Sequence, residues 1–155
     1  MDVVFKTEQA VFNYRVVGVL IQDGHVLIHR AVNDSTWSLP GGRVAIAEDS
    51  KASLKREFIE ELDVNIKIDK LLWVVENFFT YDDRKFHEIG FYYSIELDGD
   101  NTGFDQQPFH GVEGERLIYQ WVPIEQLESV PLYPEFLRTA LKNVPEQTGH
   151  LVVKQ

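Results

Sequence analysis

Three glutamates that lie close together in the chain are the residues best suited to chemistry. Glu57 is followed by Glu60 three positions later and by Glu61 four positions later. In an α-helix these offsets place all three carboxylates on one face. Carboxylate oxygens are the ligands that hard divalent cations such as Mg²⁺ and Mn²⁺ prefer. The spacing therefore indicates a cation site, with a solvated acidic face as the simpler alternative.

The cluster is costly for an isolated helix. Like charges four residues apart destabilise a helix by about 0.2–0.5 kcal/mol per pair, and acids near a helix C-terminus oppose the macrodipole. Arg56 offers an i,i+4 counter-charge to Glu60. Taken alone, such a triplet is more often a solvated face than a ligand set, and the residues upstream shift the balance toward a bound cation.

A helix over residues 50–62 must position these acids. The segment lacks Pro and Gly and is rich in Lys, Glu, Leu and Ala, which favours a helix with Asp49 or Ser50 as the N-cap. A separate apolar arc is expected to be buried, and it consists of Leu54, Phe58, Ile59 and Leu62. Upstream, Gly41 and Gly42 allow the backbone to approach another segment or a ligand closely.

These residues resemble the Nudix box. Its fixed positions are matched here by Gly42, Glu48, Arg56, Glu57, Phe58, Glu60, Glu61 and Val64 at the spacing of the box, and the lead-in 37–41, Trp-Ser-Leu-Pro-Gly, is also similar. One position departs from the pattern, because Asp63 stands where the box has a glycine. Asp tolerates the left-handed conformation that a post-helical glycine usually adopts, so we expect a modest loss of stability and no lost ligand.

The resemblance implies a hydrolase that uses Mg²⁺ or Mn²⁺ to cleave the diphosphate of a nucleoside diphosphate linked to another group, by attack of water on phosphorus. By resemblance Glu57 and Glu61 are the principal metal ligands, and Glu60 is a further ligand or the base. Arg56 would orient the glutamates. Gly42 would supply loop geometry or a backbone carbonyl, and Glu48 would support the helix start.

Three further residues are candidates for the substrate side of the site. Glu113 lies near the end of a long irregular stretch, residues 98–114, and Glu115 directly follows it. In Nudix proteins an acid from this region often joins the metal shell or acts as base. Ordinary exposed acids are the alternative. Tyr81 lies where dinucleoside polyphosphate hydrolases of the family often have a tyrosine, and a core tyrosine is the simpler interpretation.

Two other classes of function stay open. A Nudix-like domain that binds a nucleotide or a protein without turnover is the first, and the change at Asp63 favours it. A purely structural acidic helix on an unrelated α/β domain is the second, and it predicts no specific response to Mg²⁺. The intact acids at positions 57, 60 and 61 count against the first class, and the spacing of the residues from Gly42 to Val64 counts against the second.

Composition limits the remaining possibilities. A chain of 155 residues predicts one domain over 1–155. The absence of cysteine excludes disulfides and thiolate metal sites and, with no leader or membrane-spanning run, leads us to expect a cytoplasmic protein. A formal net charge of −10 argues against binding to nucleic acid or anionic membranes. A small nucleotide-type substrate and a monomer or homodimer are expected.

The other predicted elements suit an α/β/α sandwich around a mixed β-sheet. Residues 15–21 and 26–30 read as a hairpin with Asp23-Gly24 at the turn. Strand-like segments follow over 64–80, interrupted at Glu76 and Asn77, and residues 86–97 alternate as a half-buried strand. Later elements are a strand at 116–122, a helical turn at 123–127, a helix at 134–143 and a short strand or dimer contact at 150–153.

Overall fold

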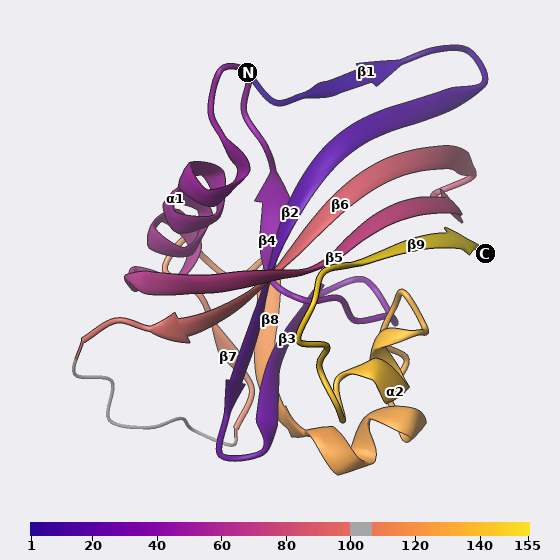
Figure 1. Cartoon of the computed structure of the whole chain (residues 1–155). Coiled ribbons are helices and arrows are strands. Elements are labelled where there is room, and N and C mark those ends of the chain that lie inside the picture. Colours follow the sequence, from indigo (N-terminus) through magenta and orange to yellow (C-terminus); the bar gives the residue numbers. More distant parts are fainter. Residues whose placement is uncertain (100–106) are drawn as a thin grey trace.

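The computed structural model describes residues 1–99 and 107–155. It shows a mixed sheet with helix α1 (Ser50–Leu62) on one face and the short helices η1 (Ile124–Ser129) and α2 (Leu137–Ala140) on the other (Figure 1). The strands are β1 (Val4–Lys6), β2 (Ala10–Gln22), β3 (His25–Ala31), β4 (Gly41–Arg43), β5 (Ile66–Tyr81), β6 (Arg84–Leu97), β7 (Phe109–His110), β8 (Leu117–Pro123) and β9 (Gly149–Lys154).

Strand β2 connects the two parts of the sheet. The strand order is β7-β8-β3-β2-β6-β5-β9, with β1 and β4 also paired to β2. Residues 10–20 of β2 run parallel to β6, residues 15–17 pair with β4, and its last two residues pair with β3 in the predicted hairpin. Because β4 leads into α1, the pairing of β4 with β2 fixes where the acidic helix begins.

Two apolar cores cover the two faces of the sheet. On the α1 side, Leu54 and Phe58 pack with Val16 of β2. On the other side, Val17 packs with residues of η1 and α2 such as Leu127 and Leu137. Successive residues of β2 therefore enter opposite cores, as the two-residue period of a strand requires. This arrangement confirms the predicted α/β/α sandwich.

Strand β5 differs from the prediction, because it continues through Glu76 and Asn77 without interruption. Both polar side chains find partners on or after the C-terminal strand β9. The Glu76 carboxylate lies 2.7 Å from Nε2 of His150, and Nε2 of Gln155 donates to Oδ1 of Asn77 at 2.9 Å. The strand persists because β9 satisfies groups that would otherwise favour a break.

Strand β6 is not half-buried as predicted. Tyr92 and Tyr93 point to opposite faces and are 3% and 5% exposed, since layers cover both sides of this central strand. Glu88 is also buried and accepts a 2.8 Å hydrogen bond from Nδ2 of Asn13 on β2. The face of β6 that the sequence predicts to be solvated is therefore buried at Glu88 and Tyr92 and exposed only near the strand end, at Glu96.

The C-terminal half contains the largest correction. The helix predicted over 134–143 is reduced to the four residues of α2, because the chain forms tight turns at both of its ends. The N–H groups of its first two residues, Leu137 and Arg138, bond only three residues back, and so do those of Lys142 and Asn143 just after it. The strand at 116–122, the turn after Pro123 and the strand at 150–153 are confirmed as β8, η1 and β9. Of the irregular stretch 98–114, residues 109–110 form β7, and residues 100–106 lie outside the described residues. None of the described helices is long and apolar enough to cross a membrane.

Candidate active site

Helix α1 begins and ends as its sequence predicts. Asp49 is the N-cap, and its carboxylate accepts a 2.9 Å hydrogen bond from the backbone N–H of Ala52. At the other end Asp63 adopts the left-handed conformation, with φ 54° and ψ 39°, and its N–H donates to Ile59 at 2.9 Å. Asp63 thus performs the backbone role expected of the missing glycine.

Gly42 makes room for the carboxylate of Glu57. A Cβ built on Gly42 would lie 2.4 Å from Cδ of Glu57 and 2.6 Å from each carboxylate oxygen. A residue with a side chain would therefore displace this acid. Burial raises the pKa of Glu57, and the Arg56 guanidinium opposes that rise. Strand β4 and helix α1 together hold a partly desolvated carboxylate.

Arg56 lies at the centre of a network of acids. Its Nε and Nη2 donate to Glu48 at 3.1 and 3.0 Å, and its Nη1 donates to Glu57 at 3.1 Å and to Glu60 at 3.2 Å. The hydroxyl of Ser53 also contacts Glu48. The hydrogen bonds from Arg56 lower the pKa of Glu48. One guanidinium therefore links the start of the helix to two of its three clustered acids.

Glu61 is the most deeply buried acid of the cluster, at 9% exposed. Burial raises its pKa to about 7, and the hydrogen bond from Tyr119 opposes that rise. The Tyr119 hydroxyl donates to Oε2 of Glu61 at 3.0 Å. Sequence reasoning missed Tyr119, because the contact joins residues 58 positions apart on different elements.

The donor set of this helix suits a hard divalent cation. Glu57, Glu60 and Glu61 offer carboxylate oxygens alone, and two of them carry pKa values raised by desolvation. Across the described residues no three His, Cys, Asp or Glu side chains are already gathered at metal-binding separation. Arg56 and Tyr119 instead occupy oxygens of the three acids. The three residues therefore suit a hard divalent cation by the chemistry of their carboxylate oxygens and not by an arrangement already formed around a metal ion.

The loop before β8 places Glu113, and not Glu115, beside Glu61. Glu113 lines a small hollow together with Glu61 and Tyr119, whereas Glu115 is absent from that lining. Arg116 forms an ion pair with Glu113 at 3.4 Å. Of the two candidate acids in the sequence, the structure places Glu113 beside the cluster.

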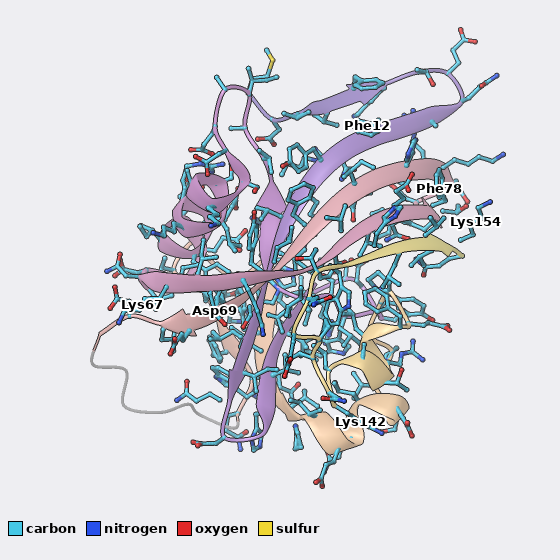
Figure 2. All side chains as sticks on the ribbon, in the orientation of Figure 1. Phe12, Lys67, Asp69, Phe78, Lys142 and Lys154 are labelled. Carbon is cyan, nitrogen blue, oxygen red and sulfur yellow. The ribbon has the colours of Figure 1, made fainter. Side chains whose placement is uncertain are left out.

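Tyr81 lies away from the acidic cluster. Its hydroxyl donates to Asp34 at 3.1 Å, and that hydrogen bond and burial raise its pKa. Figure 2 shows Phe78 at the end of the sheet opposite α1, and Tyr81 lies three residues further along β5. The structure therefore does not bring Tyr81 together with the glutamates, as the substrate-binding hypothesis would require.

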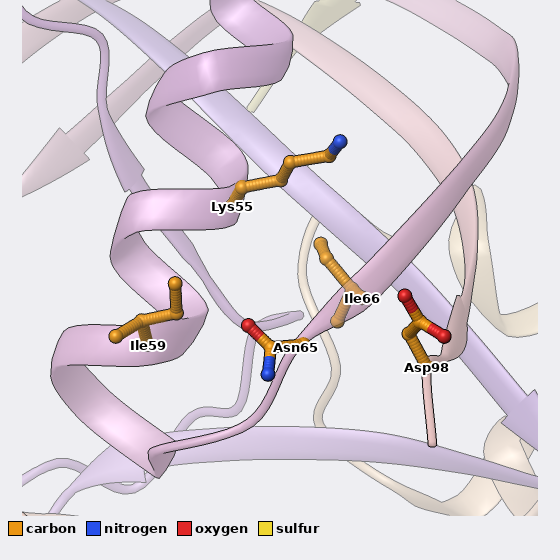
Figure 3. A pocket seen from close by; sticks show the side chains of 5 residues that line it. All are labelled: Lys55, Ile59, Asn65, Ile66 and Asp98. Carbon is orange, nitrogen blue, oxygen red and sulfur yellow. The ribbon is translucent and has the colours of Figure 1, made fainter.

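A cavity of about 410 Å³ lies on another side of α1, between the helix and the start of β5 (Figure 3). Its lining includes Lys55 and Ile59 of the helix and Asn65 and Asp98 beyond it. At about 100° per residue, Lys55 and Ile59 point roughly 160° away from Glu57. This cavity is therefore separate from the carboxylate cluster.

Comparisons with known proteins agree with this geometry. The family model described as NUDIX domain matches residues 13–144. A MutT-like protein of Streptomyces ambofaciens is 32% identical over 72 residues, which cover 46% of this chain and 47% of that protein, so the match spans about half of that relative.

Solved structures share the fold at low sequence identity. A MutT NUDIX hydrolase from Burkholderia pseudomallei matches with a TM-score of 0.64 at 24% identity, over 86% of this chain and 98% of that one. A UDP-X diphosphatase matches with a TM-score of 0.60 at 18% identity, over 94% of this chain and 69% of that one. An ADP-ribose pyrophosphatase from Streptococcus suis matches with a TM-score of 0.57 at 16% identity, over 90% of this chain and 98% of that one.

Proposed function

The chain belongs to the NUDIX domain family, and from this premise we propose that it is a divalent-metal-dependent pyrophosphohydrolase. Its substrate would be a nucleoside diphosphate linked to another group, cleaved at the diphosphate by attack of water on phosphorus. The observation that carries the proposal is the pair of desolvated acids, Glu57 and Glu61, on one helix, with Gly42 leaving space for the first.

The proposed cation ligands are Glu57 and Glu61, with Glu60 and the Gly42 carbonyl as further ligands. When bound, Mg²⁺ or Mn²⁺ neutralises diphosphate charge and lowers the pKa of a coordinated water. Arg56 orients Glu57 and Glu60 through its Nη1. Glu60 is the more exposed of these two acids, with 49% of its side chain accessible against 15% for Glu57, so it can accept a proton from water if it is not a ligand. No covalent nucleophile is required.

Positive charge near the cluster would help an anionic substrate to approach a protein of net charge −10. Arg15 of β2 lies close enough to Glu61 to lower its pKa, and its Nη2 is held by the carbonyl of Leu39 at 3.0 Å. Arg56 is the second cation of the site. We assign Arg15 to electrostatic attraction of the diphosphate.

The names of the structural relatives range over MutT, a UDP-X diphosphatase and an ADP-ribose pyrophosphatase, so they support the reaction class and not one substrate. The test is product release from nucleoside triphosphates, ADP-ribose, nucleotide sugars and dinucleoside polyphosphates, first with Mg²⁺ and then with EDTA. The proposal predicts cleavage of at least one compound that EDTA abolishes.

A nucleotide-binding or protein-interaction domain without turnover is the second candidate. Two observations favour it: Asp63 replaces the glycine of the box, and Arg56 already compensates Glu57 and Glu60. This candidate predicts that no compound of the panel is cleaved, whereas one of them raises the melting temperature. Mg²⁺-dependent turnover would exclude it.

A further inference from the structure

The ring of Tyr119 packs between two aromatic neighbours. Its ring, on β8, is 1% exposed. Phe109 of β7 stacks on it with ring centroids 5.6 Å apart and an interplanar angle of 18°, and His29 of β3 packs against it at 5.4 Å. A ring packed in this way cannot change rotamer without opening the core.

The loop between β7 and β8 brings the tyrosine and the end of α1 together. The N–H of Val112 donates to the backbone carbonyl of Glu61 at 2.8 Å. A Cβ on Gly111 would lie 2.3 Å from that carbonyl oxygen and 3.1 Å from Cε1 of Tyr119. Because Gly111 has no side chain, the last turn of α1 approaches the ring of Tyr119 closely.

The hydrogen bond between Tyr119 and Glu61 has a fixed direction. The Tyr119 hydroxyl donates to the Glu61 carboxylate at 3.0 Å, because an ionised carboxylate can only accept a hydrogen bond. It engages Oε2, and among the described residues it is the sole recorded hydrogen-bond donor to the Glu61 side chain. One carboxylate oxygen is thus anchored while the other stays available.

We propose that Tyr119 is a positioning residue for the cation site: its hydroxyl fixes the orientation of the Glu61 carboxylate so that the second oxygen faces the metal. This inference rests on the proposed function, since it assumes that Glu61 is a ligand. Hydrogen-bonded partners of metal ligands commonly contribute 10–100-fold in metal affinity. A residue that only fills the core would not change that affinity.

The test is Mn²⁺ binding in the absence of substrate, measured by electron paramagnetic resonance or by calorimetry. Tyr119→Phe removes the hydroxyl and keeps the ring, and it should weaken Mn²⁺ binding by about tenfold. Tyr93→Phe is the matched control. Tyr93 is 5% exposed in the same core, and its hydroxyl contacts Ser50 at 2.7 Å and no acid of the cluster. This control should bind Mn²⁺ as the wild type does.

A double-mutant cycle shows whether Tyr119 acts through Glu61. In a Glu61→Gln background, Tyr119→Phe should change the residual Mn²⁺ affinity less than twofold. The inference would be overturned if Tyr119→Phe lost the same factor in Mn²⁺ affinity in both backgrounds. It would also be overturned if Tyr119→Phe alone bound Mn²⁺ within twofold of the wild type. Either result would leave the proposed function intact. A wild-type protein that binds no Mn²⁺ at millimolar concentration would overturn both. Thermal unfolding of every variant verifies the fold.

Discussion

At Gly42 the chain needs a residue without a side chain, because the Glu57 carboxylate occupies the space that a Cβ would fill. The displaced atoms in Gly42→Ala would be the far end of a flexible side chain, so the fold should tolerate the change. We predict that this variant melts within a few degrees of the wild type and loses at least about tenfold in Mn²⁺ affinity. Unchanged affinity would show that Glu57 is not held in place by Gly42.

His29 gives stability a dependence on pH. It is buried on β3, and its Nδ1 has no recorded partner among the described residues. Burial, and then the charges of Arg15 and Arg116, lower its pKa from 6.5 to about 3. In the unfolded chain His29 therefore binds a proton near pH 6.5, whereas in the folded chain it stays neutral until about pH 3. The free energy of unfolding therefore decreases as the pH falls from 6.5 toward 3.

We predict that this histidine costs the wild type about 2 kcal/mol of unfolding free energy between pH 7 and pH 5. His29→Phe keeps a ring against Tyr119 and should lack this contribution, as urea unfolding at the two pH values can measure. Glu61, whose pKa is raised, shifts stability in the opposite direction in both proteins, so their difference isolates His29. Parallel pH profiles would contradict the assignment.

Among the elements, the bounds of α1 were predictable to the residue because the signals at its ends are local. Its buried face was not, since Ile59 was expected in the core and is 48% exposed. The cap at Asp49 and the turn at Asp63 depend on neighbours within four positions. Strands β5 and β6 were harder, because the partners of Glu76 and Asn77 lie 74 and 78 residues away on and beyond β9. The length of α2 likewise follows from tight turns on both sides, which an apolar periodicity does not encode.

The end of α1 offers a test of the departure from the box. Asp63 has φ 54°, a conformation that costs an L-residue free energy and costs glycine almost none. Asp63→Gly should therefore raise the free energy of unfolding by about 0.5–1 kcal/mol in urea titrations. The hydrolysis rate should stay within twofold, because Asp63 contacts none of the proposed ligands through its side chain. A large rate increase would mean that Asp63 disturbs the site itself.

For the whole molecule, the fold class and the carboxylate helix followed from sequence, and the surroundings of the helix did not. The hairpin, the glycine pair and the box are short-range patterns. Tyr119 and Glu113 reach Glu61 from β8 and the loop before it, through packing that no single segment specifies. Tyr81, for which the core was the simpler interpretation, is instead 48% exposed and bonds Asp34 away from the glutamates.

The whole molecule is strongly acidic, yet the acids proposed to act are few, and burial desolvates two of them, Glu57 and Glu61. Replacing one glutamate by uncharged glutamine distinguishes a metal-dependent hydrolase from a purely structural acidic helix, because only the hydrolase should lose Mg²⁺-dependent turnover. Glu57→Gln keeps the size of the side chain and removes a ligand charge. Glu125→Gln, on the exposed surface of η1, removes the same charge away from the cluster and serves as the control.

The decisive measurement is the Mg²⁺-dependent turnover of these two variants on the compound that the wild type cleaves, with melting temperatures recorded in parallel. Glu57→Gln should lose about 100-fold or more in kcat while remaining folded, and Glu125→Gln should match the wild type. A folded Glu57→Gln variant with near wild-type turnover would contradict the assignment of this helix as the catalytic metal site.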